Sequence, residues 1–71
     1  MSKIEKIRAD LMAEREKELV RRSEYREMAK LARESNLSHI AEKLENIADD
    51  EAQHIIVLDK IISDLKEDVG K

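Results

Sequence analysis

The sequence has 71 residues, 44% of them charged and 1% aromatic, with no cysteine, no proline and one glycine. This composition is typical of an all-α chain. The formal net charge is −3 with acidic and basic residues interspersed, which excludes the basic stripe and aromatic platform of a nucleic-acid-binding protein. A chain of this length fits one small domain, residues 1–71, with a marginal core. We therefore expect oligomerisation or a bound metal to stabilise it.

The sequence shows neither a membrane-spanning segment nor an export signal. No stretch of the sequence holds the roughly 20 consecutive apolar residues that span a bilayer. The first residues, MSKIEKIRADL, also lack the apolar run of a signal peptide. We therefore expect a cytoplasmic protein with no membrane partner.

The first predicted helix covers residues 3–34. Ser2 followed by Glu5 has the pattern of a capping box, and helix-favouring residues continue without a breaker to Glu34. At 100° per residue, one row of this helix is apolar except at its centre, where Glu18 lies. The row consists of Ile4, Leu11, Glu18, Tyr25 and Ala32.

The segment ESNLSH, residues 34–39, holds the only internal turn signal. Asn36 tolerates the left-handed conformation that ends a helix, and Ser38 can cap the next one. The second predicted helix covers residues 38–69, where Gly70 supplies a stop signal. Because the connection is short, the two helices should form an antiparallel hairpin.

Two rows of the second helix repeat every seventh residue, and each is interrupted once by a polar side chain. One row is Leu37, Leu44, Glu51, Leu58 and Leu65, and the other is Ile40, Ile47, His54 and Ile61. At about 1.5 Å per residue, Glu51 and His54 lie as far from the turn as Glu18 does on the other arm. We therefore expect these three polar side chains to be buried together at the midpoint of the hairpin.

Such a cluster is suited to metal binding. A glutamate and a histidine three residues apart on one helix can hold the same ion, and a glutamate on the facing helix adds an oxygen ligand. Three ligands make a partial site, and two helices cannot cover their own apolar rows. The simplest closure is a twofold homodimer that forms a four-helix bundle. Symmetry then supplies four glutamates and two histidines, the arrangement of di-iron and di-manganese carboxylate bundles.

The pattern E-x6-Y-x25-E-x2-H, formed by Glu18, Tyr25, Glu51 and His54, resembles one half of the ferritin-like domain of rubrerythrins. It is also similar to the two-helix encapsulated ferritins, which build their iron sites between subunits. The resemblance extends from about residue 16 to residue 62. It implies that Glu18 and His54 are terminal iron ligands and that Glu51 is a bridging carboxylate. Tyr25 would supply a hydroxyl that bonds to a ligand carboxylate.

The sequence also departs from these families. Rubrerythrins carry both halves in one chain, so the second half must here come from another subunit. They usually carry a cysteine-bound rubredoxin iron, whereas this chain has no cysteine and would need an external electron donor. One rubrerythrin half has an additional glutamate at the position of Arg21. The last residues, DLKEDVGK, do not resemble the shell-docking tail of encapsulated ferritins.

Two functions follow from the sequence. The first is a rubrerythrin- or ferritin-like di-iron protein that reacts with O2 or peroxide, as a ferroxidase or a peroxide-detoxifying oxidoreductase, with manganese as the other possible metal. The alternative is a structural hairpin that oligomerises, in which the polar residues set the register or hold a static metal. Taken singly, Glu18 could reach solvent at a rim, His54 could be a core histidine, and Tyr25 could serve packing. Four apolar residues outside the rows indicate an assembly larger than a dimer: Val20, Leu31, Ile56 and Val57.

Overall fold

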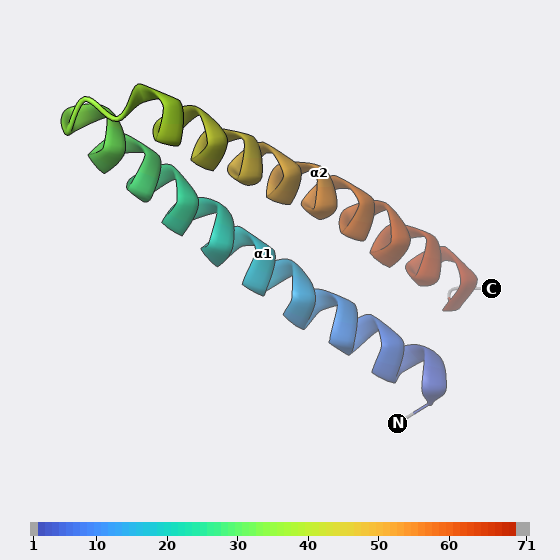
Figure 1. Cartoon of the computed structure of the whole chain (residues 1–71). Coiled ribbons are helices and arrows are strands. Elements are labelled where there is room, and N and C mark those ends of the chain that lie inside the picture. Colours follow the sequence, from blue (N-terminus) through green and yellow to red (C-terminus); the bar gives the residue numbers. More distant parts are fainter. Residues whose placement is uncertain (1, 70–71) are drawn as a thin grey trace.

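The computed structural model describes the backbone of residues 2–69 and the side chains of residues 2–65. Helix α1 (Lys3–Glu34) and helix α2 (Ser38–Val69) lie side by side, and the start of α1 and the end of α2 are at the end opposite the turn (Figure 1). The predicted antiparallel hairpin is therefore confirmed, with the helix bounds expected from the sequence. The predicted stop at Gly70 lies outside the described residues.

The start of α1 is capped as the sequence predicts. Ser2 has an extended backbone with φ −72° and ψ 163°, and its side-chain oxygen accepts a hydrogen bond of 3.1 Å from the backbone N–H of Glu5. This bond satisfies one of the N–H groups that have no partner within the first turn of a helix.

The turn between the helices is closed by backbone hydrogen bonds around a left-handed residue. Asn36 has a φ of 61°, and the N–H of Leu37 donates back to the carbonyl of Ala32 at 2.8 Å. This is the geometry of a Schellman-type helix end. The carbonyl of Leu37 accepts the first bond of α2, from Ala41 at 2.9 Å, so Leu37 holds the cap position and Ser38 is the first helical residue.

The interface between the helices is built mainly from alanine. Among residues 2–65, the buried apolar side chains are Ala29, Ala32, Ala41, Ala48 and Ile55. The row of α2 that faces α1 is therefore Ala41, Ala48 and Ile55, because small side chains permit close approach of two helices. The row that contains Glu51 is half-buried beside it. The row that contains His54, expected in the interface, lies instead at the edge, with Ile40 and Ile47 49% and 37% exposed.

The two flat sides of the hairpin differ in character. One side, which we name the charged face, is crossed by ion pairs from Arg15 to Asp59 and from Arg33 to Glu45. The other side, which we name the apolar face, carries exposed aliphatic side chains on both helices, with the row of His54 on α2. These side chains are Ile7, Met28, Ile40, Ile47 and Ile61.

The hairpin has the shape of a thin slab. Its extents are 54 × 17 × 11 Å, which is two helices wide and one helix thick. Its accessible surface is 5504 Å², whereas a globular monomer of 8.3 kDa is expected to expose about 4,600 Å². Nothing within the described residues covers the apolar face. Among the described residues, neither helix contains an apolar stretch long enough to cross a membrane.

Candidate metal centre

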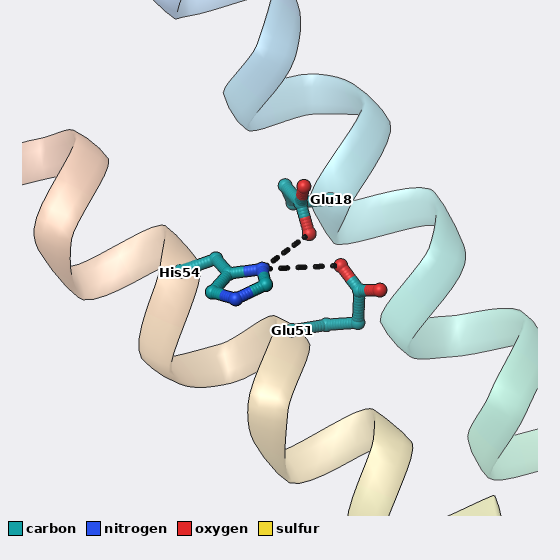
Figure 2. A group of neighbouring side chains, drawn as sticks. All are labelled: Glu18, Glu51 and His54. Atoms are coloured by element: carbon teal, nitrogen blue, oxygen red, sulfur yellow. Dashed lines mark hydrogen bonds and ion pairs between the residues drawn. The ribbon is translucent and has the colours of Figure 1, made fainter.

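Three potential metal ligands meet at the middle of the hairpin. Glu18 comes from α1, Glu51 and His54 come from α2, and the side chains converge on one point (Figure 2). One ligand atom from each residue can be chosen so that all lie within 4.8 Å of one another. The Nδ1 atom of His54 is 3.4 Å from Oε2 of Glu18 and 3.9 Å from Oε2 of Glu51. The structure thus shows the convergence that the sequence spacing predicts.

The helix geometry explains this arrangement. Glu51 and His54 are three residues apart, so they project from one side of α2 and lie about one turn apart. Glu18 extends from the row of α1 that faces them. The Glu18 and Glu51 side chains are 12% and 14% exposed, whereas that of His54 is 61% exposed. The expected burial therefore holds for Glu18 and in part for Glu51, whereas His54 is exposed and opens onto the apolar face.

The electrostatic environment of the two carboxylates favours a cation. Oε2 of Glu51 is buried and has no hydrogen-bond partner among the described residues. A buried acceptor without a partner costs about 1–3 kcal/mol, and more when it is charged. Two carboxylates and one imidazole form the mixed oxygen and nitrogen donor set that iron and manganese accept. The residues present therefore fit a divalent metal.

A pocket adjoins the cluster on the apolar face. Its lining includes His54 together with Glu14, Val57 and Leu58. The carboxylate of Glu14 is 3.3 Å from the amino group of Lys17, so Glu14 forms a surface ion pair. The pocket gives the imidazole access to solvent in a single hairpin.

Arg21 and Tyr25 are the other polar residues near the cluster on α1. Arg21, which sequence reasoning treated only as a departure from rubrerythrins, places Nη1 3.5 Å from Oε1 of Glu18. The spacing of three residues between them could have indicated this contact. Tyr25 is half-buried, and no hydrogen bond within residues 2–65 joins its hydroxyl to the cluster. Its role as a partner of a ligand carboxylate stays a prediction.

Comparison with known proteins agrees with the geometry. Residues 10–70 match the family model described as Rubrerythrin, a range that includes Glu18, Glu51 and His54. No curated protein and no solved structure matches the chain at a significant level. Because the family match covers most of the sequence, the chain belongs to the rubrerythrin family.

Proposed function

We propose that this chain is a ferritin-like di-iron carboxylate protein whose metal site forms between two copies of the hairpin. The observation that carries the proposal is the cluster of one buried carboxylate, one half-buried carboxylate and one imidazole, with ligand atoms within 4.8 Å and one carboxylate oxygen that lacks a partner. Membership of the rubrerythrin family supports the same function.

The apolar face supports a second copy as the missing half of the site. One hairpin offers three donors, fewer than iron usually requires, and His54 is 61% exposed on that face. The surface in excess of a globular monomer is about 900 Å², close to the roughly 800 Å² that each partner buries in a standard interface. In the resulting four-helix bundle, the charged faces remain in water.

Each residue then has a defined task. Glu18 and His54 would each hold one ion at its outer side, and Glu51 would bridge two ions, as the resemblance to rubrerythrins implies. Tyr25 would donate its hydroxyl to a ligand carboxylate. Two chains supply four carboxylates, which balance the charge of two divalent ions. Iron bound there would supply the redox chemistry, the oxidation of Fe(II) by O2 or peroxide, and manganese would fit the same donors.

The proposal is tested by loading the protein with Fe(II) without oxygen and then admitting air or peroxide. We expect two irons per pair of chains and a loss of Fe(II), measured with a ferrous chelator, that is faster than in buffer. A Glu18→Ala, His54→Ala double variant serves as the control. Oxidation no faster than in buffer, or equal in the control, would overturn the proposal.

A structural module is the second candidate. The observation that favours it is that Glu18 already has polar partners without metal, from Arg21 at 3.5 Å and from His54 at 3.4 Å. Under this function, the cluster sets the register of the helices, as single polar residues do in coiled coils. The protein would then form the same oligomer but would neither bind iron in fixed stoichiometry nor accelerate its oxidation.

A further inference from the structure

The two oxygens of the Glu18 carboxylate have different partners. Oε2 points to the cluster, 3.4 Å from Nδ1 of His54, and Oε1 lies 3.5 Å from Nη1 of Arg21. The Glu18 side chain is 12% exposed and that of Arg21 is 52% exposed. The half-exposed guanidinium therefore lies beside the Glu18 oxygen that is not paired with His54.

We propose that Arg21 is a positioning residue that makes Glu18 a one-oxygen ligand and favours divalent over trivalent ions. This inference rests on the proposed metal site. A guanidinium 3.5 Å from Oε1 competes with an ion for that oxygen and leaves Oε2 for the metal, because a carboxylate binds a metal through both oxygens only when both are free. Substitution of Arg21 would free Oε1 for the metal.

The charge of the site supports the preference for divalent ions. In a pair of chains, the four ligand carboxylates balance two divalent ions, and each Arg21 adds a positive charge beside them. The repulsion between Arg21 and the ion is proportional to the charge of the ion. The repulsion energy between Arg21 and a trivalent ion is therefore about 1.5 times that for a divalent ion at the same distance. A surface ion pair without this role would contribute little to stability and would not affect which ion binds.

The test compares Arg21→Gln with the parent, using Mn(II) by calorimetry and Tb(III) by luminescence titration. We expect Arg21→Gln to bind Mn(II) about 10-fold more tightly, a change of about 1.4 kcal/mol, because the repulsion between the guanidinium and the ion is removed. Because the repulsion scales with charge, the gain for Tb(III) should be about 30-fold. The visible spectrum of bound Co(II) should also weaken, since a second oxygen from Glu18 raises the coordination number.

Two further variants control for charge and geometry. Arg21→Lys keeps the positive charge and should retain the parent's preference between Mn(II) and Tb(III). Arg26→Gln removes the same charge from an exposed residue of α1 beside Glu45, where water and salt screen it, and should bind both ions as the parent does. Folding of each variant is checked by circular dichroism, and Arg21→Met replaces Arg21→Gln if the latter does not fold.

The outcomes separate this inference from the proposed function. If the parent binds neither Mn(II) nor Tb(III), the metal site is wrong and the role of Arg21 is wrong with it. If the parent binds metal but Arg21→Gln and Arg26→Gln give the same affinities and the same Co(II) spectrum, the metal site stands and the role of Arg21 is overturned.

Discussion

Glu51 is the residue at which the two candidate functions differ most. Its Oε2 atom is buried without a hydrogen-bond partner, and it interrupts a row of leucines that includes Leu44 and Leu58. If Glu51 bridges two ions, Glu51→Leu should abolish iron binding and Fe(II) oxidation. The metal-free variant should nevertheless be more stable by about 1–4 kcal/mol, because an apolar side chain replaces a buried charge. Iron content and denaturant unfolding should be measured on the same sample.

The matched control is Glu42→Leu, an exposed glutamate on the same helix. This variant should bind iron as the parent does and should show no comparable gain in stability. Retention of two irons per pair of chains in Glu51→Leu, with the parent's rate of oxidation, would refute the role of Glu51 and favour the structural module.

At the scale of the elements, the turn depends on one left-handed residue. Asn36 has a φ of 61°, a conformation that costs most L-residues about 1–2 kcal/mol and β-branched residues more. Asn36→Val should therefore lower the free energy of unfolding by at least that amount, while Asn36→Gly should leave it unchanged or raise it. Denaturant unfolding measures both. Asn46→Val, within α2, is the control and should be nearly neutral, because Asn and Val have similar helix propensities.

The ion pair between the helices near the turn predicts a dependence of stability on pH. Hydrogen bonds from Arg33, including one of 3.0 Å from Nε, lower the pKa of Glu45 below its ordinary value of 4.5. A carboxylate whose pKa falls on folding stabilises the protein above the ordinary value. That contribution is lost as the pH falls through the lowered value.

We therefore expect Glu45→Gln to unfold at a lower denaturant concentration than the parent at pH 7. The difference should shrink as the pH falls below 4.5. Because the Glu45 side chain is 43% exposed, the effect should be small and should weaken in high salt. Glu24→Gln, an exposed glutamate of α1, is the control. A difference that stays constant from pH 7 to pH 3 would contradict the prediction.

At the scale of the whole molecule, the thin hairpin should not remain a monomer. Its apolar face exposes aliphatic side chains that a second copy would cover. We expect light scattering to give a mass of about twice 8.3 kDa or a multiple of it at micromolar concentration. Ile47→Glu should shift the protein toward monomers, because it places a charge in the covered face.

Ile56→Glu is the matched variant on the opposite edge of α2. Ile56 is 60% exposed and lies outside the apolar face, so this change should leave a dimer intact. It should break only an assembly larger than a dimer. A stable, folded monomer of the parent chain would contradict the proposed assembly and the site shared between subunits.

Metal should stabilise the assembled protein. Without metal, the proposed dimer gathers four carboxylates in one place, and an ion that binds only the folded dimer raises the melting temperature by mass action. The increase with Fe(II) under anaerobic conditions, or with Mn(II), should be absent in Glu51→Leu. Equal melting curves with and without metal in the parent would count against a buried ligand cluster.

Residue order alone was sufficient to predict the two helices, the turn and the meeting of Glu18, Glu51 and His54. These features depend on local signals and on distance along the chain: the cap at Ser2, the left-handed residue Asn36, and a rise per residue that is the same on both arms. Membership of the rubrerythrin family agrees with the same spacing.

The rows that face each other, and the contacts that follow, were decided only by tertiary packing. An apolar stripe on each helix is wide enough for several rotations about the helix axis, and the closest approach is reached when the row of Ala41 and Ala48 is inside. That rotation moves His54 to the edge, 61% exposed. By contrast, the contact between Arg21 and Glu18 lies within one helix and follows from their spacing of three residues. Periodicity identifies the apolar stripe of each helix. The rotation of the helix about its axis depends on the volumes of the side chains that face each other, which periodicity does not specify.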